Sequence, residues 1–296
     1  MLNVSALSKA TGHARGIRPR QFGFLDRLGP WLIYIPLTIG ALIMVVPFIW
    51  MISTSLTTDQ YVLSPTPSLI PQPATLASYT QLFELMNIGG MFVNSLFVTT
   101  VTTIGQVLTS AMAAYAFARM HWRGQNVVFV LYLITLMVPS QVTIVPLFIL
   151  MRLLGWVNTY QALILPGLFS AFGTFLLRQS FSGIPRELEE AAFLDGATHW
   201  TVFWRVILPL SGPGLATLTV FSFMGSWNSY LWPLFVARQD AMLTLPVGLA
   251  RLQGQHLTQW NLVMAGAVIS IIPILIVYLF AQKAFVRGIA LSGLKG

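Results

Sequence analysis

The segment Glu187-Leu-Glu-Glu-Ala-Ala-Phe-Leu-Asp-Gly196 holds four of the eight acidic residues of this 296-residue chain. Pro185 suits a first helical turn, where its missing N–H costs nothing, and Glu187 lies where an acid favours the positive end of the helix dipole. The closing Asp-Gly ends that helix, because glycine accepts a left-handed turn. A second segment, 198–208, is ended by Pro209. The sequence therefore predicts helix, turn and helix between two apolar spans.

The composition is that of a membrane protein. Hydrophobic residues make up 56% and charged residues only 8%, whereas soluble chains have about 25% charged residues. Division of the chain at its charges gives six long uncharged runs, and each exceeds the roughly 20 residues that a transmembrane helix needs. A seventh run, 60–83, carries four prolines within nine positions and is expected to be a loop outside the membrane. We therefore predict an all-α integral membrane fold with six transmembrane helices, from the runs 28–58, 85–118, 124–151, 153–177, 206–237 and 252–282.

The basic residues predict the orientation of these helices. If the two ends and the even-numbered links lie on one side, that side holds 13 of the 16 Lys and Arg residues. The opposite side keeps only Arg152, Arg238 and Arg251. By the positive-inside rule, both termini and the acidic stretch are cytoplasmic. Membrane topology and anionic lipid headgroups explain the net charge of +8, so no nucleic acid is expected as a partner.

The acidic stretch resembles the cytoplasmic EAA loop of ABC importer permeases. The family pattern is Glu-Ala-Ala, three residues, Gly, nine residues, Ile, any residue, Leu-Pro. Here Glu190-Ala191-Ala192, Gly196 and Leu208-Pro209 keep that spacing, and Val206 replaces the usual Ile. The segments 228–234 and 244–249 and the C-terminal end resemble the carbohydrate-uptake branch of these permeases, and most of all its maltose-type second subunit.

The resemblance implies a type I ABC importer permease fold in which residues 91–283 form the permease core (transmembrane helices 2–6). Residues 1–29 are then a basic cytoplasmic tail, and 30–90 hold the first transmembrane helix and the Pro-rich external loop. Residues 284–296 form a C-terminal cytoplasmic tail. The cytoplasmic coupling loop is expected at about 181–210.

The resemblance also implies the function and the partners. The chain would be the permease of a binding-protein-dependent importer in the cytoplasmic or inner membrane, moving an oligosaccharide, monosaccharide, polyol or glycerol phosphate. Its expected partners are an ABC ATPase dimer, a second homologous permease in a heterodimer, an extracytoplasmic solute-binding protein and the lipid bilayer. The residues expected in the coupling loop are Glu187, Glu190, Ala191, Ala192, Asp195, Gly196, Leu208 and Pro209.

Several site types are not expected in this chain. It has no Gly-x-x-x-x-Gly-Lys-Ser/Thr phosphate loop, so ATP and Mg²⁺ belong to the partner ATPase, and we expect no cofactor and no enzymatic activity here. It has no Cys, and its four His residues lack ligand spacing, so no metal site is expected. The runs also lack acids and bases away from their ends, which disfavours the alternative of a stand-alone proton-coupled secondary transporter. Sodium coupling through backbone carbonyls stays open.

Three polar or aromatic residues are candidates for the substrate path. Asn228, Tyr230 and Trp232 carry polar atoms and aromatic faces that suit sugar hydroxyls and C–H faces. The alternative is an interfacial aromatic belt made of Trp227, Trp232 and Trp260. No catalytic residue is expected.

Overall fold

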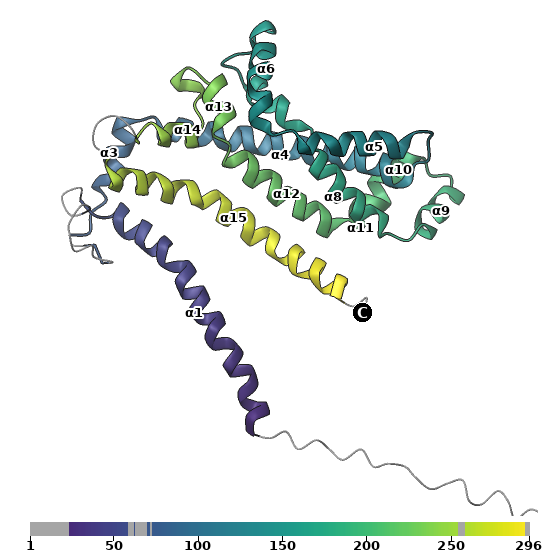
Figure 1. Ribbon diagram of the computed structural model, residues 1–296, viewed down its shortest axis with the longest axis horizontal. Helices are drawn as coiled ribbons and strands as arrows, with labels where there is room; N and C mark the ends of the chain where they lie inside the picture. Colours follow the sequence, from purple (N-terminus) through teal and green to yellow (C-terminus); the bar gives the residue numbers. More distant parts are fainter. Residues whose placement is uncertain (1–23, 59–61, 63–69, 72, 254–257, 294–296) are drawn as a thin grey trace, which may run out of the picture. The chain divides into compact units, whose positions relative to one another are not determined.

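A computed structural model describes residues 24–58, 62, 70–71, 73–253 and 258–293, and all regular elements in that part of the chain are helices. The chain divides into two compact units, 1–49 and 50–296, with the boundary inside the first helix, α1 (Phe24–Ser55). The predicted N-terminal tail lies mostly outside the described residues, as does much of the Pro-rich loop. The remaining helices belong to the second unit (Figure 1).

The second unit contains two helices of more than 30 residues, 88–119 and 260–293, and a series of shorter helices (Figure 1). The helices are α3 (Ala77–Leu85), α4 (Ile88–Arg119), α5 (Gln125–Ile134), α6 (Ser140–Leu153), α7 (Tyr160–Ile164), α8 (Ala171–Ser182), α9 (Glu187–Leu194), α10 (His199–Val202), α11 (Leu208–Leu210), α12 (Gly212–Trp227), α13 (Leu231–Val236), α14 (Leu245–Ala250) and α15 (Trp260–Gly293).

Three single helices in the described residues are long and apolar enough to cross a membrane: 34–55 of α1, all of α4, and 260–282 of α15. They coincide with the first, second and sixth predicted runs. The other predicted spans are bent pairs, and if each bent pair counts as one span the total reaches six. The fold is therefore all-helical with three to six candidate spans.

The bends occur where proline or a short 3₁₀ turn interrupts the helix. α5 continues into a 3₁₀ turn, Thr135–Met137, and α6 then departs at 98° directly after Pro139. Between α7 and α8, the 3₁₀ turn Leu165–Leu168 produces a bend of 41°. Proline supplies no N–H to the helical ladder and disfavours a helical conformation in the residue before it, so these positions favour a break.

One predicted boundary is wrong. The fifth run was expected to continue as one helix to about residue 236, but α12 ends at Trp227, and α13 begins at Leu231 after a break over Asn228–Tyr230. At the other end of the chain, α15 continues without interruption to Gly293, into the segment expected as the C-terminal tail. α15 is thus longer than the hydrocarbon core requires.

The helices α4, α8, α12 and α15 form the core of the second unit. α4 packs against α8 and α12, and α12 also packs against α15. Small residues allow the close approach of α4 and α8: a Cβ added at Gly173 would lie 2.6 Å from Ser110 Oγ. Such small-residue contacts are typical of helix pairs in membranes, where backbones approach closely.

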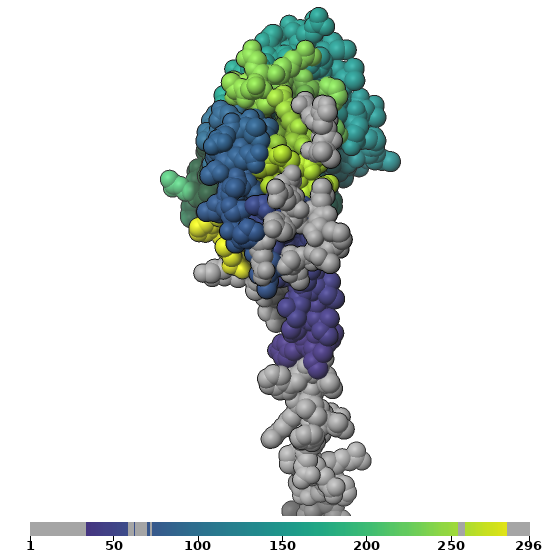
Figure 2. Space-filling model, turned by 90° about the vertical axis from the view of Figure 1, so that its left-hand side faces the viewer, coloured from purple at the N-terminus to yellow at the C-terminus, as the bar shows by residue number. Residues whose placement is uncertain are grey.

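The end of α4 opposite Arg119 is tied to the segment that precedes α14. The Asn94 amide donates to the carbonyls of Ala241 and Leu243, and the Ser95 hydroxyl accepts from the Leu245 N–H at 2.7 Å. The space-filling view shows the blue surface of α3 and the start of α4 next to the yellow-green surface of α13 and α14 (Figure 2). α4 is therefore fastened by hydrogen bonds at this end as well as by apolar packing.

Trp227 lies in the core and not in an interfacial belt. Its side chain is 1% exposed and stacks on Phe223 with the ring planes 7° apart. Its Nε1–H donates to the Ser270 carbonyl at 3.0 Å. Trp260, in contrast, is 43% exposed. The belt interpretation is wrong for Trp227, because its position on α12 points it at α15.

Replacing Trp227 by phenylalanine is expected to lower the free energy of unfolding by about 1–2 kcal/mol. The variant keeps the aromatic packing and loses the hydrogen bond from α12 to Ser270 on α15. Thermal unfolding of the detergent-purified protein measures the change, with Trp260→Phe as the control. Equal melting temperatures for the two variants would contradict a core role for Trp227.

Candidate functional site

The acidic stretch forms α9 and a tight turn, as the sequence predicted. The N–H groups of Glu189 and Glu190 both donate to the Arg186 carbonyl, which starts the helix. At its end, the N–H of Ala197 donates to the Ala192 carbonyl at 2.9 Å, and Gly196 adopts φ +82°. This is the glycine C-cap in which a left-handed residue closes the helix. Gly196 therefore makes the turn between α9 and α10.

The second half of the loop departs from its prediction. α10 is capped by the Thr198 hydroxyl, which accepts from the Thr201 N–H. The helix then widens into a π turn over Phe203–Ile207 and continues as α11 beyond Pro209, whereas the sequence predicted an end at that proline. The π turn changes the pattern of backbone hydrogen bonds just before Pro209, which has no N–H to donate. The direction changes only at Ser211, by 81° between 199–210 and α12.

The loop is anchored by residues next to those that the motif indicated. Leu208 is half-buried and Pro209 is exposed. The buried anchors are Val202, Phe203 and Ile207, which are at most 2% exposed and pack with residues of α4, α8 and α12. An i, i+4 spacing from Phe203 to Ile207 on an apolar face was the sequence signal for these positions.

The exposed side of α9 carries the motif residues. Glu187, Glu190 and Ala191 are exposed, and Ala192 is half-buried. Leu194 is 89% exposed at the end of the helix, and Asp195 and Gly196 beside it are exposed as well. α9 thus presents two carboxylates, a small residue and an apolar side chain to its surroundings.

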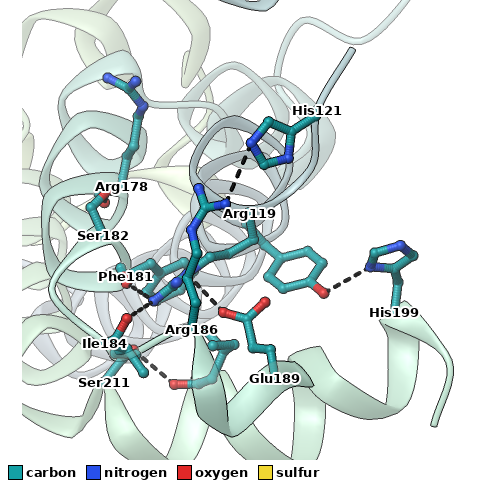
Figure 3. A network of polar contacts seen from close by, with 12 residues as sticks. Arg119, His121, Arg178, Phe181, Ser182, Ile184, Arg186, Glu189, His199 and Ser211 are labelled. Atoms are coloured by element: carbon teal, nitrogen blue, oxygen red, sulfur yellow. Dashed lines mark hydrogen bonds and ion pairs between the residues drawn. The ribbon is translucent and has the colours of Figure 1, made fainter. Parts of the chain in front are cut away.

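The buried polar contact of the site involves Glu189, which the sequence did not single out. Its Oε1 lies 3.0 Å from Nε of Arg119, the last residue of α4, and both side chains are almost fully buried. The Nε–H is not aligned for a hydrogen bond, so the contact is an ion pair. Arg119 Nη2 donates to the carbonyls of Phe181 and Ile184, the latter at 2.6 Å (Figure 3). Glu189 thereby fastens α9 to α4.

Further polar contacts surround this pair. The Tyr115 hydroxyl lies 3.1 Å from His199 Nδ1, at the start of α10. Arg186 Nη1 lies 3.5 Å from His121 Nε2 on the exposed side of the cluster (Figure 3).

Burial raises the pKa of the Glu189 carboxyl, while the positive charge of Arg119 and, less strongly, of Arg186 opposes that rise. No group of three or more His, Cys, Asp or Glu residues that could hold a metal occurs in the described residues.

Replacing Gly196 by alanine is expected to destabilise the loop by about 1–2 kcal/mol. No atom lies within 4 Å of an added Cβ, so the cost comes from the φ of +82° and not from a clash. Asparagine tolerates this conformation better and should cost less. Limited proteolysis of the loop measures the effect, and equal cleavage rates for the alanine and asparagine variants would contradict it.

The candidate substrate-path residues lie beside two open cavities. Asn228, Tyr230 and Trp232 line a cavity of about 530 Å³ together with residues of α6. Trp232 also borders a second cavity of about 380 Å³, and its Nε1–H donates to the Ala162 carbonyl at 2.8 Å. Asn228 turns back to donate to the Met224 carbonyl of its own helix. All three residues therefore line the larger cavity, and Trp232 also lines the smaller one.

The smaller cavity has a wall rich in hydroxyl groups that the sequence did not identify. α4 and α12 contribute most of these side chains, and Thr244 adds another. The hydroxyl oxygens of Thr102, Ser222 and Thr244 are buried and have no hydrogen-bond partner within the described residues. The polar residues on the wall are Ser95, Thr99, Thr102, Gln106, Ser222, Ser226, Ser229 and Thr244.

The chain is similar to known transport proteins over most of its length. Residues 106–291 match the family described as binding-protein-dependent transport system inner membrane component. The arabinooligosaccharides transport system permease protein AraQ of Halalkalibacterium halodurans is 37% identical over 90% of this chain and 96% of its own. The sn-glycerol-3-phosphate transport system permease protein UgpE of Yersinia pestis is 35% identical over 86% of this chain and 94% of its own.

Solved structures show the same fold. A crystal structure of a bacterial ABC transporter involved in the import of the acidic polysaccharide alginate includes a chain with a TM-score of 0.77 and 27% identity, covering 88% of this chain and 98% of that one. The matched family segment contains the C-terminal part of α4, all of the α9–α10 loop and most of α15. The chain therefore belongs to the family of inner-membrane components of binding-protein-dependent transport systems.

Proposed function

We propose that this chain is the permease subunit of a binding-protein-dependent ABC importer for a sugar-like solute, with the α9–α10 loop as its coupling site. The observation that carries the coupling proposal is that α9 exposes Glu190 and Ala191 while Glu189 ties the same helix to α4. Family membership places the protein in the inner membrane and the ATPase on a separate chain. In this proposal the chain has six spans and both termini are cytoplasmic, so the loop lies on the side where ATP is hydrolysed.

In this proposal α9 docks into a cleft of the ATPase, which binds ATP and Mg²⁺. Glu190 pairs with a basic group there, and Glu187 and Asp195 add negative charge beside it. Ala191 and Ala192 allow the two backbones to come close. Gly196 sets the angle between the two helices, and Leu208 and Pro209 connect the loop to α12. Closure of the ATPase dimer would then move α9 and change the accessibility of the solute path.

The solute is proposed to be polyhydroxylated. The relatives' names give arabinooligosaccharides, sn-glycerol 3-phosphate and, for SmoH of Agrobacterium fabrum, sulfoquinovosyl glycerol. All of these compounds carry several hydroxyl groups. The hydroxyl-rich wall of the smaller cavity, with Trp232 at its edge, offers donors and acceptors for such groups and an aromatic face for their C–H bonds.

The remaining partners are an extracytoplasmic solute-binding protein, on which the family depends by its description, and a second permease. We propose a heterodimer, because the maltose-type importers that the sequence resembles pair two different permeases. The binding protein would deliver the solute to the external side, and the two permeases would enclose the path between them. A stand-alone secondary transporter is the competing function, and it would need neither of these chains nor an ATPase.

A single-cysteine cross-link tests the coupling proposal. The natural chain has no cysteine, so Leu194→Cys, at an 89% exposed position on α9, provides one defined reactive site on it. In native membranes a short bifunctional thiol–amine reagent should join this variant to the ATPase chain. Leu153→Cys, 79% exposed at the end of α6 on the proposed external side, is the matched control and should give no such product.

Purification from the same membranes extends the test. Recovery of an ATPase and a second permease with the intact chain supports the importer. If the chain is recovered alone, and transports without ATP, the secondary-transporter alternative takes its place. A cross-link from Leu153→Cys but not from Leu194→Cys would reject the assignment of α9 as the docking helix.

A further inference from the structure

The last turn of α4 contacts both halves of the coupling loop. Tyr115 and Arg119 are four residues apart and therefore lie on one face of α4. Arg119 pairs with Glu189 of α9 at 3.0 Å, and the Tyr115 hydroxyl lies 3.1 Å from His199 Nδ1 of α10. A single helix face thus holds the two short helices on either side of Gly196.

Arg119 also forms hydrogen bonds with the segment that precedes α9. Its guanidinium donates to the carbonyl of Phe181, near the end of α8, and to that of Ile184, three residues before α9 begins (Figure 3). Hydrogen bonds with a charged donor are shorter and stronger than neutral ones. The Arg119 side chain is 3% exposed and that of Glu189 9%, so little water competes for these contacts.

α9 has few other attachments to the rest of the permease. Glu189 is its only buried residue, and its large apolar side chains Leu188, Phe193 and Leu194 are all at least 38% exposed. Apolar packing is therefore weak here, and the ion pair is the main side-chain connection of α9. The contact between Glu189 and Arg119 is therefore where α9 is joined to the end of α4.

We propose that the last turn of α4, through Arg119 and Tyr115, receives the movement of the coupling loop and delivers it to the solute path. α4 continues from this turn as one unbroken helix, and its residues Gln106 and Thr102 line the smaller cavity. Thirteen residues of helix separate Arg119 from Gln106, which is about 20 Å. Glu189, Arg119 and Tyr115 are positioning residues. This inference rests on the proposed function of α9.

The test follows the cavity directly and needs no known solute. Gln106→Cys is introduced into the cysteine-free chain, and the complex with its partner chains is purified intact. The rate at which a membrane-impermeant maleimide labels this cysteine is measured without nucleotide and after trapping with ATP and vanadate. In the otherwise unchanged chain we expect the rate to change by about tenfold, as for a typical coupling between two sites.

The added substitution Glu189→Gln removes the ion pair and keeps the side-chain shape. We expect the labelling rate to become nearly independent of ATP, while the ATPase is still recovered and still hydrolyses ATP. Glu189→Asp keeps the charge and should restore part of the response. The labelling rates with and without ATP are compared only in complexes that contain the ATPase. A lower yield of complex from a purely structural effect therefore does not change the ratio of the two rates. Glu84→Gln, at an exposed carboxylate on α3, is the matched control.

An unchanged ATP response in Glu189→Gln overturns the proposal. If that variant does not assemble, Glu189→Asp and Tyr115→Phe take its place. The first removes only one methylene group, and the second removes only one hydroxyl. Each should weaken the response, and a full response in both also overturns the proposal. Failure of the proposed function gives a different pattern: Leu194→Cys does not cross-link to the ATPase, and Gln106→Cys in the unchanged chain does not respond to ATP.

Discussion

The variant Glu190→Ala is expected to lower ATP hydrolysis stimulated by the binding protein, and import with it, at least about tenfold, because truncation of one partner of a buried charge pair costs about 2–5 kcal/mol. Glu190 is exposed in the isolated chain and has room for a partner's basic group. Its loss leaves that group without a counter-charge at the interface. The measurement is ATP hydrolysis by the reconstituted complex, with and without the loaded binding protein.

The control for this prediction is Asp240→Ala. Asp240 is another exposed carboxylate, paired with Arg251 at 2.7 Å on the proposed external side. Its pair is exposed to water and should contribute little, so stimulated hydrolysis should stay within about twofold of the parent. Stimulated hydrolysis that is unchanged in Glu190→Ala would contradict docking through this residue, and a drop in both variants would indicate a general loss of assembly.

The acidic stretch was predictable because its signals are local. Pro185, the acids of the first turn and Gly196 specify the start, polarity and end of an eight-residue helix, and each acts within one turn of the backbone. The long uncharged runs predicted α1, α4 and α15 for a similar reason, since length and apolarity alone decide whether a helix can span a bilayer. The family match confirms the family that the motif indicated.

The partner of Glu189 was not predictable from local signals. Glu189 and Glu190 are adjacent acids, and only the rotation of α9 against α4 decides which is buried. Seventy residues separate Arg119 from Glu189, so no spacing rule connects them. The presence of an arginine at the end of an apolar run is equally well explained by the positive-inside rule. The distinction between an anchoring and an exposed carboxylate came from tertiary packing.

The shape of the spans could not be predicted from the sequence either. A proline at 139 favours a break, but the angle of 98° depends on the packing of α5 against α8 and of α6 against α13. Trp227 carries the same local signal as an interfacial tryptophan, and its burial against α15 depends on a contact 43 residues away. The hydroxyl groups on the cavity wall come from α4, α12 and the segment before α14, so they assemble only in the folded chain.

The variant Arg119→Ala is expected to be the most destabilising single substitution proposed here, at about 3–5 kcal/mol, because it leaves a buried carboxylate without its counter-charge. It also removes the donor to the carbonyls of Phe181 and Ile184. Thermal unfolding and the amount of protein in the membrane measure the loss. The control is Arg251→Ala, which breaks the ion pair with Asp240, whose two side chains are 47% and 81% exposed. It should lower the free energy of unfolding by less than about 1 kcal/mol.

The destabilisation should depend on pH in a defined direction. Burial already raises the pKa of Glu189, and the charge of Arg119 opposes the rise. Without Arg119 the folded-state pKa rises further. A raised pKa makes the protonated carboxyl the favoured form in the folded protein, so stability is highest below the ordinary pKa and falls as the pH rises through the folded-state value. The deficit of Arg119→Ala against the parent should therefore shrink as the pH is lowered towards the ordinary pKa of a glutamate carboxyl.

A second substitution separates the buried charge from the loss of packing. Adding Glu189→Leu to Arg119→Ala removes the unpaired carboxylate, and apolar replacements of buried ion pairs are often tolerated. The double variant should regain part of the lost stability and lose the added pH dependence, since the carboxyl with the raised pKa is no longer present. It should not regain the ATP response of the cavity, because the connection between α9 and α4 is still absent. A double variant as unstable as Arg119→Ala at every pH would show that the two carbonyl contacts, and not the charge of Glu189, dominate the role of Arg119.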